Sequence, residues 1–193
     1  MEHTDEELIV ATLAGDDRAF PELVSRYMQP LYNFILRLSG SAADAEDISQ
    51  EAFVKVWKNL KKYRQGESVR AWIFTIARNT TIDWLRKRRN LVFSDFENAE
   101  GENPLLATLT AVEPLQDELF AREEDRAVLE GAFVQLSVLH REVLTLHYVE
   151  GLTFDEIGKV LKAPLHTVKS RHHRALIRLR EIMAPIPALH PYK

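Results

Sequence analysis

The sequence predicts an all-α protein built from two small helical domains that are joined by a flexible acidic linker. Apolar residues recur at the helical period of 3.6 throughout the 193-residue chain, and no run alternates β-branched residues as a strand would. The chain has only 7 glycines and 8 prolines, so turn signals are few. One acidic stretch without a sustained period divides it. We therefore expect domains at 1–90 and 118–193, with a linker at 91–117.

The N-terminal domain begins with three predicted helices. Thr4 and Glu7 stand at capping-box spacing, which indicates the start of the first helix. An apolar stripe from Phe20 to Leu38 predicts the second, in which Pro30 is expected to introduce a kink. The segment DAEDISQEAFVKVWKNLKKY predicts the third. Its inward residues are expected to be Ile48, Ala52, Phe53, Val56, Trp57 and Leu60.

Polar residues occupy the outward face of this third helix. They are Asp47, Gln50, Glu51, Lys55 and Lys58. Two interpretations stay open, because such a face is either simply solvated or a docking surface for a protein partner.

The loop YRQGES, Tyr63–Ser68, ends the third helix and precedes a fourth. The inward stripe of the fourth helix is expected to comprise Val69, Trp72, Ile73, Ile76, Ala77 and Thr80. Arg78, Asn79 and the cluster Arg86–Arg89 are expected to lie outside. Four adjacent cations repel one another unless an anion is near, so the cluster indicates a nucleic-acid contact. A glycine-containing loop beside a basic helix could also hold an unstacked base.

The formal net charge of −4 conceals alternating blocks of opposite sign. Residues 1–49 carry a net charge of −7, 50–90 carry +8, 91–125 carry −9 and 126–193 carry +4. Two basic blocks separated by an acidic one indicate two nucleic-acid contacts on one chain. The acidic linker either keeps the chain soluble, or follows a basic channel on a partner as a nucleic-acid strand would.

The segment from Leu152 to Met183 has the pattern of a helix-turn-helix. Thr153 and Glu156 repeat the capping-box spacing, and Pro164 favours a fresh helix start after a break at 162–163. Seven Lys and Arg residues and no acid lie between positions 159 and 180. A second helix with this basic outer face is typical of a DNA-reading helix, although an ordinary solvated helix is the alternative.

Several classes of protein are not expected from this composition. The absence of cysteine excludes a disulfide framework and a thiolate metal site. No apolar run reaches 18 residues and the start MEHTDEELIV is acidic, so we expect a cytoplasmic protein. Without a P-loop, an HExxH motif or a nucleophile elbow, we expect no enzyme, metal, cofactor or small-molecule substrate. A free-standing helix-turn-helix regulator is the alternative, though such proteins usually carry a βαβ domain that is missing here.

Four segments in order resemble the bacterial extracytoplasmic-function sigma factors of the sigma-70 family. They are DEELIVATLAGDDRAFPELVSRY, DAEDISQEAFVKVWKNL, SVRAWIFTIARNTTIDWLRKRR and VEGLTFDEIGKVLKAPLHTVKSRHHRAL. The resemblance implies an alternative sigma factor that binds core RNA polymerase and promoter DNA. Its first domain would recognise the −10 element and its second the −35 element. It also implies a membrane-associated anti-sigma factor, which would hold the chain at the inner membrane.

The resemblance further implies roles for individual residues. Those expected to bind polymerase are Asp47, Gln50, Glu51 and Lys55. Those expected at the −10 element are Arg64, Gln65 and Ser68 around a flipped base, with Asn79, Arg86, Arg88 and Arg89 along the melted strand. Those expected at the −35 element are His166, Thr167, Lys169, Ser170, His173 and Arg174. The family usually has a small residue at the position of His166 and a proline at that of Ser137.

Overall fold

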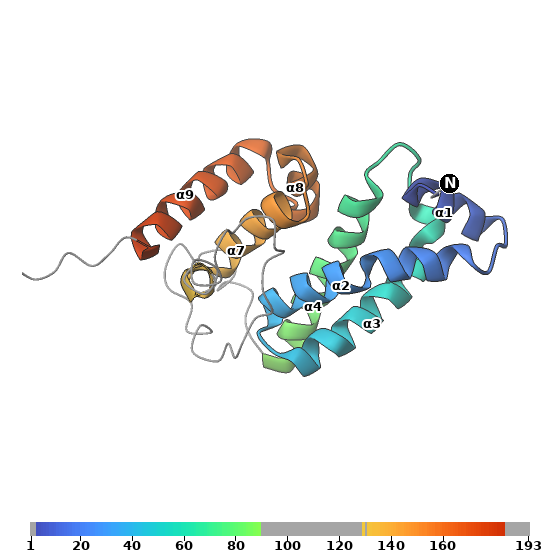
Figure 1. Cartoon of the computed structure of the whole chain (residues 1–193), viewed down its shortest axis with the longest axis horizontal. Coiled ribbons are helices and arrows are strands. Elements are labelled where there is room, and N and C mark those ends of the chain that lie inside the picture. Colours follow the sequence, from blue (N-terminus) through green and yellow to red (C-terminus); the bar gives the residue numbers. More distant parts are fainter. Residues whose placement is uncertain (1–2, 90–128, 130, 184–193) are drawn as a thin grey trace, which may run out of the picture.

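The computed structural model describes residues 3–89, 129 and 131–183, and every regular element within them is helical (Figure 1). The expected linker, 91–117, lies outside the described residues. The N-terminal bundle consists of α1 (Asp5–Leu13), α2 (Ala19–Ser39), α3 (Ala42–Asn59), a 3-10 turn (Leu60–Lys62) and α4 (Val69–Arg89). The C-terminal bundle consists of α7 (Val138–Leu144), a π-helical turn (Thr145–Val149), α8 (Phe154–Leu161) and α9 (Leu165–Met183).

Both predicted capping boxes are confirmed. The Thr4 hydroxyl accepts from the Glu7 amide at 3.2 Å, and the Glu7 carboxylate accepts from the Thr4 amide at 2.7 Å. Thr153 and Glu156 repeat the arrangement at 3.3 and 2.8 Å. Ser137, at the position of the family's proline, caps α7 by accepting from the His140 amide at 3.3 Å. Local polar sequence therefore sets where these three helices begin.

Thr153→Ala is expected to destabilise the chain by about 0.5–2 kcal/mol, because an amide in the first turn of α8 loses its acceptor. Urea-induced unfolding followed by circular dichroism measures this loss. Thr153→Ser keeps the hydroxyl and should remain close to wild type. Equal unfolding free energies for the alanine variant and wild type would contradict the assigned role of the cap.

Helix α2 forms the centre of the N-terminal bundle and runs through Pro30 without a break. It ends at Ser39 and is capped by Gly40, which adopts the left-handed conformation with φ of 70°. Phe34 is fully buried, and its ring meets that of Phe74 of α4 edge to face at 5.1 Å between centroids. The predicted apolar stripe of α2 is thus confirmed as the surface against which α1, α3 and α4 pack.

One inward assignment in α3 is wrong. Trp57 is 53% exposed, whereas Phe53, Val56 and Leu60 are buried as expected. A step of about 100° from Val56 turns position 57 toward the solvent side of the helix. The Trp57 ring instead meets Phe20 edge to face at 4.8 Å on the surface.

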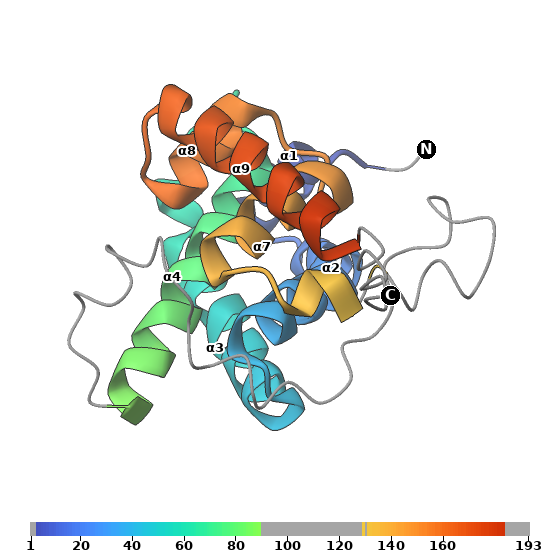
Figure 2. The ribbon, with the colours of Figure 1, turned by 90° about the vertical axis from the view of Figure 1, so that its left-hand side faces the viewer.

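Helix α4 lies between the rest of its own bundle and the C-terminal bundle, with α8 packed along it (Figures 1 and 2). The predicted stripe of α4 is buried or packed against the core. Burial also extends beyond that stripe, to Ala71, Phe74, Thr81 and Leu85. Together, its own bundle and the C-terminal bundle leave few exposed residues between 69 and 85 of α4.

Candidate nucleic-acid interface

The helix-turn-helix is confirmed and its turn is tight. Lys162 ends α8 in the left-handed conformation with φ of 51°, and α9 begins at Leu165, directly after Pro164. A Cβ added at Gly158 would lie 3.0 Å from the carbonyl oxygen of Ala163. Glycine therefore permits the chain to pass this close to α8 as it turns into α9.

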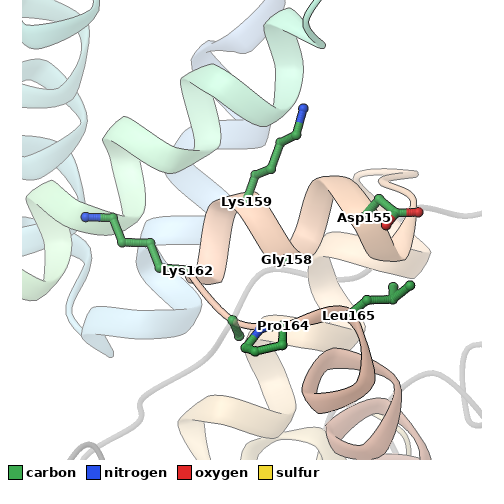
Figure 3. Close-up of a pocket in the computed structure, with 7 residues that line it drawn as sticks. Asp155, Gly158, Lys159, Lys162, Pro164 and Leu165 are labelled. Atoms are coloured by element: carbon green, nitrogen blue, oxygen red, sulfur yellow. The ribbon is translucent and has the colours of Figure 1, made fainter.

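An open hollow of about 450 Å³ lies at this turn. Its lining residues are Asp155, Gly158, Lys159, Lys162, Ala163, Pro164 and Leu165. The side chains of Lys159 and Lys162 extend away from the turn, while Asp155 lies toward the other end of α8 (Figure 3). Both lysines line the hollow and reach outward from it, so their ammonium groups could contact an anion such as a DNA phosphate beside the turn.

The outer face of α9 presents the residues expected at the −35 element. Its inner face is anchored by Val168 and Ala175, which are both fully buried. Thr167 is half-buried. The exposed members are His166, Lys169, Ser170, His173 and Arg174. The structure thus brings the predicted set together on one side of one helix, in the arrangement that a major-groove reader requires.

An aromatic and histidine cluster supports α9 from behind. His147 stacks on Phe154 at 4.5 Å between ring centroids, and the Tyr148 hydroxyl lies 3.1 Å from Nε2 of His172. Partial burial, with His147 and His173 nearby, holds the pKa of His172 below its usual value. His172 is therefore a packing residue, whereas its neighbour His173 is exposed.

The loop 63–68 of the N-terminal bundle is held in place by hydrogen bonds. The amide of Gly66, which has φ of 85°, donates to the Glu6 carboxylate at 2.8 Å. The Ser68 hydroxyl accepts from the Ala71 amide at 3.2 Å at the start of α4. Arg64 and Gln65 are exposed at the tip. A fixed loop with exposed polar side chains can receive an extruded base.

The other residues expected at the −10 element follow α4 away from this loop. Asn79 is half-buried and Arg86 is exposed, while the side chains of Arg88 and Arg89 lie outside the described residues. Ser68 and Arg86 are about 27 Å apart along the helix at 1.5 Å per residue. The expected set forms a strip that an extended strand could follow, and not a single pocket.

The outward face of α3 is partly apolar. Asp47 and Gln50 are exposed, and Lys55 pairs with Glu51 at 2.8 Å. Val54 is 50% exposed on this face, next to the Trp57 already described. The polar residues of this face follow from the sequence, whereas its apolar centre was not predicted, although the i, i+3 spacing of Val54 and Trp57 indicates it. A mixed face of this kind suits a protein partner better than solvent alone.

Ion pairs between described residues join the bundles, and the sequence did not predict them. Nε of Arg78 lies 2.9 Å from the Glu142 carboxylate, and Nη1 of Arg70 lies 2.9 Å from that of Glu150. Both glutamate side chains are only 2% exposed. The expectation that Arg78 lies outside is therefore wrong, because the C-terminal bundle covers it.

The Glu150 carboxyl of this interface is strongly perturbed by its burial. Burial raises the pKa of its carboxyl to about 7, and the positive charges of Arg70 and Arg37 oppose the increase. The desolvation of Glu150 thus outweighs the attraction of its arginines, which keeps the group partly protonated near neutral pH. The contact between the bundles therefore includes a carboxylate whose burial costs desolvation free energy.

Among the described residues, no three or more His, Asp or Glu side chains converge as metal ligands would. Within the same part of the chain, no helix has the length and apolar character needed to cross a membrane. The exposed residues expected to contact DNA on α9, in the 63–68 loop and at the end of α4 carry cationic, amide, hydroxyl and imidazole groups. These groups suit contacts with phosphates and base edges.

Comparison with known proteins finds two family matches on this chain. The model for Sigma-70 region 2 matches residues 23–91, and that for Sigma-70, region 4 matches residues 132–181. The chain is 32% identical to the ECF RNA polymerase sigma factor SigW of Bacillus subtilis over 168 residues, 86% of this chain and 90% of that one. It is 31% identical to the ECF RNA polymerase sigma-E factor of Escherichia coli K12 over 173 residues, 89% and 90% of the two chains.

Two solved structures share the fold. One is the sigma factor RpoE in complex with the anti-sigma factor NepR from Bartonella quintana, with a TM-score of 0.63 and 26% identity over 85% of this chain and 96% of that one. The other is CnrH in complex with the cytosolic domain of CnrY, with a TM-score of 0.65 and 24% identity over 93% and 96%. At that identity, the likeness to CnrH is one of fold.

Proposed function

The chain belongs to the extracytoplasmic-function sigma factors of the sigma-70 family, and on that premise we propose how its two bundles divide the work of initiation. It is an alternative sigma factor that directs promoter-specific transcription, with core RNA polymerase and promoter DNA as its partners. We assign residues 1–90 to a region 2 domain, 91–117 to a linker and 118–193 to a region 4 domain. The family matches at 23–91 and 132–181 support a division of the chain into two domains.

We propose that α9 reads the −35 element in the major groove. The exposed face of α9 is the observation that carries this proposal, since it combines two long cations with a hydroxyl and two imidazoles and is backed by a buried apolar seam. Arg can bind guanine in a bidentate manner, and Ser and His can reach either kind of base edge. Lys159 and Lys162, at the turn, would bind the adjacent backbone phosphates.

Promoter-specific run-off transcription tests the function as a whole. Adding the full chain to core polymerase is expected to produce a transcript from a cognate promoter and none from a promoter with a scrambled −35 element. A chain that binds DNA alone, and leaves the promoter selectivity of core polymerase unchanged, would instead be a free-standing regulator.

We propose that the N-terminal bundle captures and melts the −10 element. The 63–68 loop would hold an extruded base through Arg64, Gln65 and Ser68, and the strand would then follow α4 past Asn79 to its basic end. These groups favour melting because they bind unstacked bases, which exist only in the open promoter. Binding energy drives this step, so no catalytic residue is needed.

Asn79→Ala is expected to impair promoter opening while leaving polymerase binding intact, because Asn79 lies on α4 and away from the outward face of α3. Permanganate reactivity of thymines in the −10 region reports opening, and gel filtration with core polymerase reports binding. Loss of one amide contact should reduce the open fraction about 5- to 150-fold, as for a base contact worth about 1–3 kcal/mol. Thymine reactivity equal to that of wild type would exclude this role for Asn79.

The outward face of α3 is the surface that we propose for core polymerase. Asp47, Gln50, Glu51 and Lys55 would form its polar part, around the exposed Val54 and Trp57. An exposed aromatic ringed by polar groups is the composition of an interface centre.

We also propose an anti-sigma partner for this chain. The RpoE structure is a complex with the anti-sigma factor NepR, and the CnrH structure is a complex with the cytosolic domain of CnrY. A membrane-associated partner of this kind would hold the chain at the inner membrane from the cytoplasmic side, where polymerase and promoters are found.

A further inference from the structure

We propose that Glu6 of α1 is a positioning residue for base capture: its carboxylate fixes the peptide between Gln65 and Gly66 and so sets which backbone group the 63–68 loop presents to the extruded base. This inference rests on the proposed −10 role of the loop. It adds to that role a residue 60 positions away in the sequence, which acts through the loop and not on DNA itself.

The tip of the loop is a tight turn with glycine at its third position. The Glu67 amide donates to the Arg64 carbonyl at 3.1 Å, which closes a four-residue turn. Gly66 has φ of 85°, and Gln65 before it has no positive φ. Positive φ at the third residue alone is typical of a type II turn. The dihedrals on either side of its central peptide differ from those of a type I turn by about 150–170°, so the two turns point that peptide in opposite directions.

The Glu6 carboxylate selects one of these two directions. The Gly66 amide donates to it at 2.8 Å, and an ionised acceptor makes such a bond stronger. The N–H and C=O of a trans peptide lie in one plane and point opposite ways, so the Gln65 carbonyl points away from Glu6. The loop therefore presents an acceptor on the side opposite Glu6, where a flipped peptide would present a donor. Bases differ in their donors and acceptors, so the direction of this peptide bears on which base fits.

Helix α1 is fixed firmly enough to act as a support for the loop. Leu8 and Ile9 are buried in the core of the bundle. The Asp5 carboxylate pairs with Arg26 of α2 at 3.0 Å and accepts from the Tyr27 hydroxyl of the same helix. The helix lies beside the 3-10 turn that leads into the loop (Figure 1). The bond from Glu6 thus ties the loop to an element that is itself anchored on α2.

Separate contacts hold the two ends of the loop. The Tyr63 ring meets Trp72 of α4 edge to face at 5.5 Å between centroids, and its hydroxyl donates to the Glu67 carbonyl. Ser68 caps the start of α4, as described above. Burial, followed by the negative charge of Glu6, raises the pKa of the Tyr63 hydroxyl, which agrees with a carboxylate beside the loop. Of these contacts, the one from Glu6 is the contact that reaches the central peptide of the turn.

Hydrogen exchange of the Gly66 amide, measured by NMR on the free full-length chain, tests the bond itself. Glu6→Ala is expected to raise the exchange rate roughly 2- to 10-fold, the effect of losing one hydrogen bond. Glu6→Gln keeps an acceptor oxygen and should stay close to wild type. Glu22→Ala is the matched control, because it removes the same charge from an exposed pair with Arg26 on α2.

The base selectivity of the reconstituted holoenzyme tests the consequence. Affinity is measured for fork-junction promoter fragments whose −10 element is unpaired and carries each of the four bases in turn at every position. Gln65→Ala identifies the captured position as the one at which the spread of the four affinities narrows. At that position, Glu6→Ala should narrow the spread roughly 2- to 10-fold, whereas Glu6→Gln and Glu22→Ala should retain it.

Two results would overturn the proposal. One is a Gly66 exchange rate in Glu6→Ala equal to that of wild type, which would show that the carboxylate does not hold the peptide. The other is unchanged selectivity in Glu6→Ala at a position where Gln65→Ala loses it, which would show that the turn keeps its direction without the bond. Unchanged selectivity in both Arg64→Ala and Gln65→Ala is a different outcome, because it would contradict the proposed base capture and this inference with it.

Discussion

Phe74→Ala is expected to lower the unfolding free energy by about 3–5 kcal/mol, the largest stability effect that we predict for a single substitution. Phe74 is fully buried in α4, and its ring packs edge to face on Phe34 of α2. Removing it leaves a cavity in the helix pair that supports the proposed −10 strip. Urea-induced unfolding followed by circular dichroism measures the change.

Val10→Ala is the matched control for this prediction. Val10 is 53% exposed on α1, so its truncation should stay within about 0.5 kcal/mol of wild type. If Phe74→Ala had the same unfolding free energy as the control, the loss of the Phe74 ring would cost no stability, which would contradict its close packing in the N-terminal bundle.

Arg174→Ala is expected to have the largest effect on promoter recognition. The residue is exposed on the outer face of α9, where a bidentate contact with a base is worth about 1–3 kcal/mol. We therefore expect the affinity of the reconstituted holoenzyme for its promoter to fall roughly 5- to 150-fold. Competition binding with promoter fragments at one fixed salt concentration measures the change.

Two variants give this prediction its specificity. Arg174→Lys keeps the charge and loses the fork of donors, so it should recover little of the discrimination between bases. Arg180→Ala, at the exposed end of the same helix, should weaken binding to all sequences alike. Wild-type affinity and selectivity in Arg174→Ala would exclude α9 from reading the −35 element through this residue.

Much of the fold could be predicted because its signals are local. The Thr4 and Thr153 caps, the apolar stripe of α2 and the break before Pro164 each depend on residues within one or two turns. The face of α9 followed from the same periodicity. The exposure of most residues predicted for the outer face of α9 is therefore confirmed. Their contacts with DNA bases stay predictions.

The missed features depend on residues that are distant in sequence. Arg78 and Glu142 are 64 positions apart, and Arg70 and Glu150 are 80 apart. Neither pair follows from a helical period, so the sequence alone predicts an exposed Arg78, which the structure contradicts. The exposure of Trp57 was mispredicted for a different reason. Trp57 directly follows the buried Val56, and its apolar character alone suggested that it also belongs to the core.

The placement of the tryptophans also gives the molecule a built-in optical label. All three tryptophans of the chain, at positions 57, 72 and 84, belong to the N-terminal bundle, where Trp57 meets Phe20 and Trp72 meets Tyr63. Emission excited selectively at tryptophan therefore follows the melting of that bundle alone, whereas helical ellipticity follows both. If the bundles melt as one cooperative unit, the two signals share a single transition, and independent bundles separate them.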